Sequence, residues 1–349
     1  MRVILFAFLS VLPKLLFGQN TISGTVIDKS TQEPLPSATV YIDGTTKGCI
    51  TDAEGRFTLK DVIYPATIIA SFIGYQPIAL SLSANAGELN FKLEPNTQLP
   101  EVKVYGKSER DEYLKNFKNK FLGEDTWGRK AIIKNDEVLM FSNEIVTETE
   151  KETTVFRAWA NEPIIIDLPL LGYEVHVILD DFYACVTEGH TVCGSFGYYY
   201  YKPYETSDQK KTDRYAKNRR RVYYNSRQHF LRSWYENSLA ENGYKVVTEH
   251  DHQPIDLYQY SDRTDDDSMM AHGLMNQHFV ILYRHKSDGS PKPIENKNMG
   301  FSYYISGISF AQDTCVFTRQ GMVLNESIRF MGDIGDKRIG SCLPQDYVP

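Results

Sequence analysis

A long hydrophobic run is missing after residue 19, so the sequence predicts no membrane-spanning helix in the mature protein. The first residues contain only a short apolar run, Val3–Leu12, which follows the basic Arg2 and stops at Pro13. This arrangement is typical of a secretory signal peptide, with the small Gly18 near the cleavage site. We therefore expect residues 1–19 to be removed, and we expect export to the periplasm, the outer membrane or the extracellular space. An uncleaved anchor is the alternative.

Cysteine is scarce, and no Cys-x-x-Cys pair is present, which disfavours a zinc site built from cysteines. In an oxidising compartment the five cysteines can form two disulfides, which leaves one free thiol. Cys185 and Cys193 flank an expected turn, and Cys315 and Cys342 are close enough in sequence to meet. Cys49 has no local partner, so it is the expected free thiol.

Catalytic motifs are absent as well. A zinc carboxypeptidase needs a His followed three residues later by Glu, and none of the eight histidines has that neighbour. There is no Gly-x-Ser-x-Gly elbow, no Walker loop and no dinucleotide fingerprint. The Ser-x-x-Lys match at Ser207–Lys210 lacks the Lys-Thr-Gly that accompanies it in penicillin-binding enzymes. We expect no enzyme activity and no cofactor, with an unrecognised hydrolase as an alternative.

Positive charge is also in deficit, since 38 Lys and Arg face 45 Asp and Glu, for a net charge of −7. This balance, together with export, argues against a nucleic-acid partner. One segment is basic. The pattern at 208–224 predicts a helix with Tyr215 and Val222 toward a core and its basic side chains mostly in solvent. Two kinds of binding partner are left open for this basic segment: an acidic partner and the headgroup surface of a membrane.

Short β-branched and apolar runs, separated by turn residues, dominate the first part of the chain. They cover residues 22–27, 38–42, 48–51, 56–59, 67–72, 78–82 and 89–93. Such spacing is typical of an all-β sandwich. Several residues at turns and in strands form a recognisable combination: Gly24, Asp52, Gly55, Phe57, Gly74 and Tyr75.

This combination resembles the carboxypeptidase regulatory-like domain, a transthyretin-like sandwich that accompanies functional modules and has no chemistry of its own. The resemblance implies a seven-stranded β-sandwich at 20–95. Residues 96–107 are an expected linker strand, similar to the segment that follows the same domain in TonB-dependent outer-membrane transporters. The remaining chain is far too short for a transport barrel of roughly 22 strands.

The region 108–349 is predicted to be one mixed β/α domain, which makes the whole chain mainly β with an α+β second domain. Ser108 is the expected cap of a helix that ends near Gly123, and Ser226 is the expected cap of another that stops at Asn242–Gly243.

This region resembles exported Bacteroidetes-type proteins that contain the regulatory-like domain. The matching segments are Phe121–Gly123, Leu171–Tyr173, His229–Leu231 and Leu343–Tyr347. The resemblance implies no known substrate or catalytic residue.

Two groups of residues are candidate sites. Tyr199, Tyr201 and Tyr204 belong to a tyrosine-rich strand that could stack on a sugar, although sheet packing explains the same residues. His250, His252 and Asp256 are the best metal-like group, although their spacing matches no standard site and also suits a surface loop.

These features together predict a non-enzymatic, exported cell-envelope protein that acts as a partner-binding, adhesion or scaffolding module. The expected partner is an envelope protein or a glycan. Carbohydrate binding through the tyrosine-rich strand is the main alternative.

Overall fold

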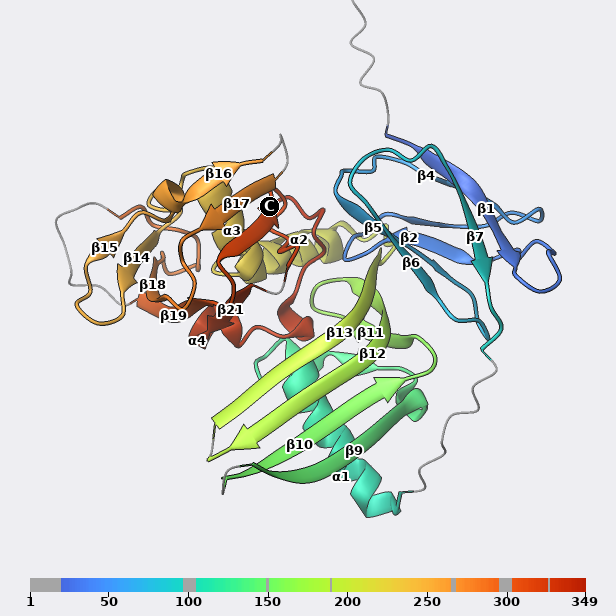
Figure 1. The fold of residues 1–349 in the computed structure, drawn as a ribbon, viewed down its shortest axis with the longest axis horizontal. Helices are drawn as coiled ribbons and strands as arrows, with labels where there is room; N and C mark the ends of the chain where they lie inside the picture. Colours follow the sequence, from blue (N-terminus) through green and yellow to red (C-terminus); the bar gives the residue numbers. More distant parts are fainter. Residues whose placement is uncertain are drawn as a thin grey trace, which may run out of the picture.

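The computed structural model describes residues 20–96, 105–148, 151–188, 190–264, 268–294, 303–325 and 327–349. The expected signal peptide, 1–19, and the middle of the expected linker strand, 97–104, lie outside the described residues. The described chain forms three lobes, namely an N-terminal sandwich, a central sheet and a C-terminal α/β region (Figure 1). No helix within these ranges is long and apolar enough to cross a membrane.

Two sheets form the N-terminal sandwich, with strand orders β4-β1-β7 and β3-β2-β5-β6. The strands are β1 (Ile22–Asp28), β2 (Thr39–Ile42), β3 (Gly48–Ile50), β4 (Arg56–Leu59), β5 (Ala66–Ser71), β6 (Ile78–Leu82) and β7 (Glu88–Leu93). These seven strands follow the predicted runs, so the predicted sandwich is confirmed. Along β7 the residues Leu89, Phe91 and Leu93 alternate with exposed ones and fill the space between the sheets.

Two residues of the recognised combination have clear structural roles. A Cβ at Gly24 would lie 1.7 Å from the Leu89 carbonyl oxygen, so glycine is needed for β1 and β7 to pair. The Asp52 carboxylate accepts hydrogen bonds from the backbone N–H groups of Glu54 and Arg56, at 3.0 and 2.8 Å, and fixes the turn before β4.

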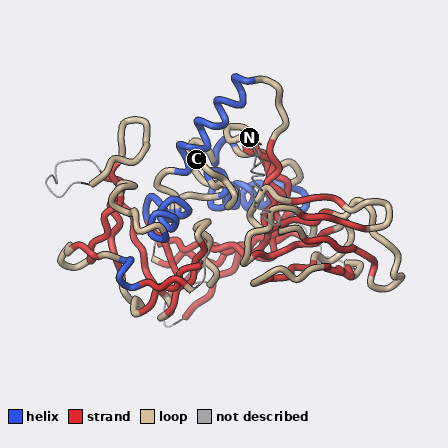
Figure 2. The backbone as a smooth tube through the Cα atoms, turned by 90° about the horizontal axis from the view of Figure 1, so that it is seen from above, coloured by secondary structure: helices blue, strands red, loops and turns tan. Residues whose placement is uncertain are grey.

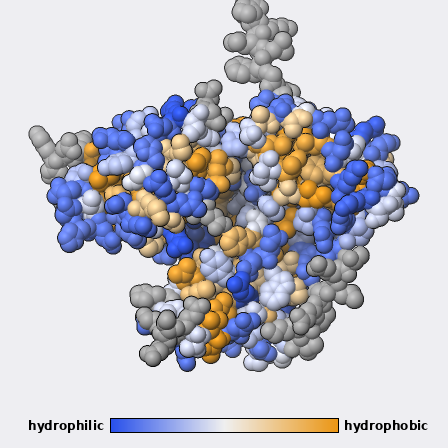
Figure 3. Space-filling model, viewed as in Figure 1, coloured by the Kyte–Doolittle hydropathy of each residue, from blue (hydrophilic) through white to orange (hydrophobic). Residues whose placement is uncertain are grey.

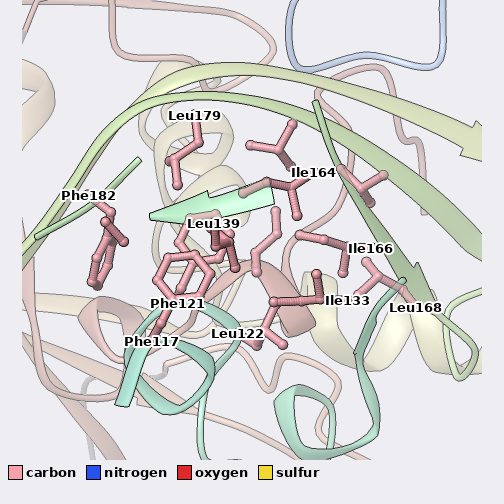
Figure 4. Packing of buried hydrophobic residues seen from close by; sticks show 14 of the residues in the cluster. Phe117, Phe121, Leu122, Ile133, Leu139, Ile164, Ile166, Leu168, Leu179 and Phe182 are labelled. Atoms are coloured by element: carbon pink, nitrogen blue, oxygen red, sulfur yellow. The ribbon is translucent and has the colours of Figure 1, made fainter. Parts of the chain in front are cut away.

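The central lobe is a six-stranded antiparallel sheet with the order β8-β11-β12-β10-β9, in which β13 pairs with β12. Its strands are β8 (Ile132–Ile133), β9 (Leu139–Glu148), β10 (Lys151–Ala160), β11 (Ile164–Leu168), β12 (Tyr173–Thr187) and β13 (His190–Pro203). Helix α1 (Lys107–Phe117) and the π-helical turn Lys118–Leu122 cover one face of this sheet. The Phe117 and Phe121 rings pack edge-on against Phe182 in that core, and Figure 4 shows Leu122 beside Ile133.

The start of α1 corrects one prediction. Its N-cap residue is Gly106, no side chain caps it, and Ser108 lies inside the helix. Packing of Tyr113 and Phe117 on the sheet positions the helix without a side-chain cap, because tertiary contacts contribute most of a helix's stability.

Helices α2 (Gln209–Tyr223) and α3 (Arg227–Tyr235) lead into the C-terminal lobe. Its other elements are β14 (Tyr244–Thr248), β15 (Pro254–Ile255), β16 (Ser261–Arg263), β17 (Ser268–His272), β18 (His278–Arg284), β19 (Tyr303–Phe310), β20 (Thr314–Thr318), β21 (Ile328–Met331) and α4 (Gly332–Gly335). Short 3-10 turns occur at Gly128–Lys130, Asp136–Val138, Leu257–Tyr260 and Ile339–Ser341. The strands form two sheets, β15-β14-β18-β19-β21 and β16-β17-β20. Seen from above, the helices lie mainly on one side of the strand layers (Figure 2).

The start of α3 was predicted correctly and its end was not. The Ser226 hydroxyl accepts a hydrogen bond from the backbone N–H of His229, so the predicted cap is confirmed. The helix stops at Tyr235, well before the predicted Asn242–Gly243, because Asn237 has a positive φ of 53° that helical geometry excludes.

The region after the linker contains two hydrophobic cores. One lies under the central sheet, and the other surrounds Phe230 and Trp234 in the C-terminal lobe. Near its end the chain returns to the first core, where Ile339 is buried. Lys337 joins the two parts, since its Nζ donates to the carbonyl oxygens of Val222 and Tyr224, both at 2.9 Å.

Candidate functional site

The tyrosine-rich strand β13 divides its side chains between the two faces of the central sheet. Tyr199 and Tyr201 pair with Val177 and Val175 of β12 and belong to the core under the sheet. Side chains alternate along a strand, so Tyr198 and Tyr200 point to the opposite face. The tyrosines therefore do not form one continuous surface.

The three predicted ligand-binding tyrosines do not share a solvent face. Tyr201 is 4% exposed and packs edge-on against Tyr173, with ring centroids 5.8 Å apart. Burial raises the pKa of the Tyr199 hydroxyl to about 12, and this hydroxyl bonds to Ser195 Oγ at 3.1 Å. Tyr204 lies beyond the strand and packs edge-on against Tyr215 of α2. These positions give the three rings structural roles.

Strand register and side-chain alternation place a different aromatic group on the face of the central sheet opposite α1. This group is Trp159, Tyr183, Phe196 and Tyr198, and we call it the aromatic face. The Tyr183 and Phe196 rings are nearly parallel, with an interplanar angle of 28° and centroids 6.3 Å apart. A Cβ at Gly194 would lie 2.5 Å from the Tyr183 ring, so this glycine leaves room for the ring to lie flat on β13.

The aromatic face is partly open to solvent, since Phe196 is exposed while Trp159, Tyr183 and Tyr198 are half-buried. Phe196 is 44% exposed, and Val192 on the same side of β13 is 59% exposed. An ion pair between Arg157 and Asp181 crosses this side of the sheet from β10 to β12. In Figure 3, hydrophobic and hydrophilic side chains are mixed over the lobe that holds the sheet. Flat rings beside a charged pair can stack on a ligand and hydrogen-bond to it.

The N-terminal sandwich docks at one end of the aromatic face through backbone hydrogen bonds. The Gly44 N–H donates to the Tyr199 carbonyl at 2.7 Å, and the Tyr201 N–H donates to the Thr45 carbonyl at 3.0 Å. The Tyr41 and Tyr200 rings stack with centroids 5.1 Å apart. A loop of the sandwich thus pairs with the edge of the central sheet.

Asp43 is the charged group at this junction. Its Oδ1 accepts a hydrogen bond from the Tyr199 N–H at 2.7 Å. Burial nevertheless raises the pKa of the Asp43 carboxyl to about 6, because loss of water disfavours the charged form more than the hydrogen bonds favour it.

The C-terminal segment completes the junction. Asp346 Oδ1 accepts a hydrogen bond from the Thr46 N–H at 3.0 Å, and the Gln345 N–H donates to the Gly44 carbonyl at 2.8 Å. Arg219 and Tyr347 help to line a cleft of about 430 Å³ beside these contacts. The segment is therefore packed against both the sandwich and the central lobe.

The metal-like residues do not converge. His250, His252 and Asp256 are all exposed, and Asp256 accepts the Tyr258 N–H at 3.1 Å as the cap of a 3-10 turn. Across the described ranges, no group of three or more His, Cys, Asp or Glu is placed to hold a metal ion. The loop interpretation of these residues fits their positions.

All five cysteines are free thiols in the structure. Cys193 points into the core under the sheet, whereas Cys185, paired with Val192, points to the other face. Cys315 is buried in the C-terminal core, and Cys342 packs against the central one. Neither predicted pair is brought together.

Two buried ionisable groups outside this face have structural partners. Burial lowers the pKa of His229 to about 3, and its Nδ1 bonds to the Tyr244 hydroxyl at 2.8 Å. Burial also lowers the pKa of Lys337 to about 8, while its ammonium is held by two carbonyl groups. These groups are satisfied inside the fold.

Comparison with known proteins agrees with the architecture of the first lobe. Residues 22–104 match the family model of the CarboxypepD_reg-like domain, a non-catalytic domain, so the resemblance stated from the sequence is confirmed. A TonB-dependent receptor, SusC of Bacteroides thetaiotaomicron, is 43% identical over 89 residues. That match covers 25% of this chain and 8% of the receptor, so the chain spans a small part of its relative.

The solved structures that resemble this chain do so only weakly. A cohesin–X-dockerin complex from Acetivibrio cellulolyticus is 22% identical, with 27% of this chain and 72% of that chain covered, at a TM-score of 0.20. A protein of unknown function from Bacteroides fragilis, described as membrane-associated, is 12% identical, with 54% of this chain and 99% of that chain covered, at a TM-score of 0.19. Scores this low carry no functional argument.

Proposed function

We propose that this chain is a non-enzymatic, exported cell-envelope protein that binds a partner through the aromatic face. The observation behind the proposal is an open sheet face with Phe196 at 44% exposure, while helix α1 fills the other side of the sheet. Exposed aromatic side chains gathered on one surface are typical of interaction sites.

Two observations support the envelope setting. The first 19 residues have the pattern of a signal peptide, and the first lobe, which matches the regulatory-like domain model, is similar to part of a TonB-dependent receptor. Adhesion and scaffolding are compatible with this role, because both need a stable surface and no chemistry.

The docked sandwich supports binding by making one wall beside the face. Its Tyr41 ring stacks on Tyr200, two residues along β13 from Tyr198. Because backbone hydrogen bonds hold the sandwich there, the partner would meet a preformed surface, which lowers the entropic cost of binding.

A site-specific crosslinking experiment tests the proposal. A photoreactive amino acid in place of Phe196 should give a specific adduct in intact envelopes, because that side chain lies in the face. The matched control places it at Ile63, which is 49% exposed on the sandwich. Added wild-type protein should suppress the adduct, whereas the Tyr183→Ala, Tyr198→Ala double variant should not. No adduct at 196, or the same adducts at both positions, would refute the proposal.

A glycan is the second candidate partner, and the nearly parallel Tyr183 and Phe196 rings favour it, because flat rings cover the apolar faces of sugars. The Arg157–Asp181 pair could bond to hydroxyl groups beside them. Glycan-array binding that disappears in Tyr183→Ala and Tyr198→Ala would assign the face to carbohydrate. Array binding that survives both changes would remove this surface from consideration.

A further inference from the structure

Helix α2 has two faces of opposite character. Its packed side includes Val222, which is 3% exposed, and Tyr215, which lies against Gly172. Arg219 belongs to this side too, since its Nε donates to the Leu171 carbonyl at 2.7 Å and its guanidinium lies 3.9 Å from the Tyr173 ring centroid. Arg219 therefore holds α2 against the central lobe and does not belong to the solvent-exposed basic surface.

The other side of α2 carries a cationic stripe, which we define as Lys210, Arg214, Lys217 and Arg221. All four side chains are exposed. At 3.6 residues per turn they line up along one edge of the helix, roughly opposite the packed side, over about 16 Å. Exposed Lys211 and Arg220 flank the stripe.

These six cations have no ion-pair partner among the residues that the structure describes. Two acids belong to this helix: Asp208 caps its N-terminus by accepting the Lys210 N–H at 2.9 Å, and Asp213 accepts a hydrogen bond from Gln209 Nε2 at 2.8 Å. The chain as a whole has a net charge of −7, and the part of it outside these six cations is more acidic still. A negatively charged surface would attract this helix and repel the remainder, which fixes the orientation of approach.

The chemistry of the cationic stripe limits the class of partner that can bind it. Stable protein interfaces are anchored by buried aromatic or apolar side chains, and the exposed side of α2 offers charged and amide groups instead. Mobile phosphate headgroups need no such anchor, and each nearby Lys or Arg strengthens the attraction to them. We propose that the cationic stripe docks the protein peripherally on an anionic phospholipid surface. The choice of lipid rests on the proposed envelope setting, whereas the aromatic face plays no part in it.

Vesicle co-sedimentation of the full chain tests this inference. Vesicles containing phosphatidylglycerol should bind the protein, whereas pure phosphatidylcholine vesicles should not. The triple variant Lys210→Glu, Arg214→Glu, Lys217→Glu should lose affinity by about 100-fold or more. Raising the salt concentration should weaken wild-type binding, because the attraction is electrostatic.

A matched control reverses three exposed lysines elsewhere, Lys60→Glu, Lys92→Glu and Lys286→Glu, and should keep most of the binding. Thermal unfolding checks that each variant is folded, and glutamine in place of glutamate at the stripe gives a milder version should folding fail. Equal losses in the two triple variants, or equal binding to both vesicle types, would overturn the inference. Binding to duplex DNA without binding to vesicles would also overturn it. The crosslinking test at Phe196 is independent, so failure of either proposal is recognisable.

Discussion

At the scale of single residues, the Asp43 carboxyl makes the contact between sandwich and sheet depend on pH. Its pKa of about 6 in the fold lies above the ordinary value of 3.8, so the folded protein holds this proton more tightly than the unfolded chain. At neutral pH the buried Asp43 carboxyl is charged, and this charge lowers the stability of the folded protein. Stability at this contact should fall as the pH rises from about 4 to about 6, because that is the range between the two pKa values.

Asp43→Asn removes this titration while keeping an oxygen that accepts the Tyr199 N–H. We expect the variant to be more stable than wild type by about 1–2 kcal/mol at pH 7.5 and equal to it at pH 4. Thermal unfolding of both proteins between pH 4 and pH 8 measures the difference. A difference that stays constant over this range would show that Asp43 does not titrate there.

The tyrosines of β13 show what a sequence reveals about a face and what it hides. Alternation alone predicts that Tyr199 and Tyr201 share one face and that Tyr198 and Tyr200 share the other. It does not say which face is buried, because tyrosine stands on both. That information lies in β12, where Val175 and Val177 mark the buried side and pair with Tyr201 and Tyr199 across the hairpin.

At the scale of elements, the two expected serine caps give a matched pair for experiment. Ser226→Ala should lower the free energy of unfolding by about 1 kcal/mol, because its hydroxyl accepts the His229 N–H at the start of α3. Ser108→Ala should have almost no effect, since Ser108 is exposed inside α1 and caps nothing. Denaturant unfolding of the two variants measures both values. Equal losses would contradict these roles.

Local elements were predictable and their assembly was not. The seven sandwich strands follow from short runs bounded by turn residues, because turn chemistry is local. The central sheet pairs β8 with β11 and β10 with β12, and no hairpin turn in the sequence encodes either pairing, because other elements lie between the paired strands. The helix stop at Tyr235 was missed for a related reason. Asn237 adopts a positive φ, and the sequence offers a more conspicuous stop signal at Asn242–Gly243.

At the scale of the whole molecule, the segment near the C-terminus holds the first lobe in place. Asp346 accepts hydrogen bonds from both the N–H and the hydroxyl of Thr46 on the sandwich. Its removal should loosen the sandwich on the sheet edge without unfolding either lobe, because each has its own hydrophobic core.

Asp346→Ala should therefore speed amide hydrogen exchange at residues 44–46 and 199–201, where the two lobes share backbone hydrogen bonds. Exchange in the core strand β5 should stay unchanged. Asp313→Ala is the control, since it removes the same charge from an exposed position in the C-terminal lobe. Exchange that is unaltered by Asp346→Ala, or accelerated equally by Asp313→Ala, would count against this role.

The return of the chain to the central core has a consequence for the architecture as a whole. Val222 and Ile339 belong to the same core, so nearly everything between them is an insertion into the central lobe. Lys337 binds the carbonyl groups of Val222 and Tyr224, so the entrance and the exit of the inserted lobe meet at one side chain. The inserted lobe can therefore vary in size and sequence, or be exchanged for another, while the sheet that carries the aromatic face keeps its shape.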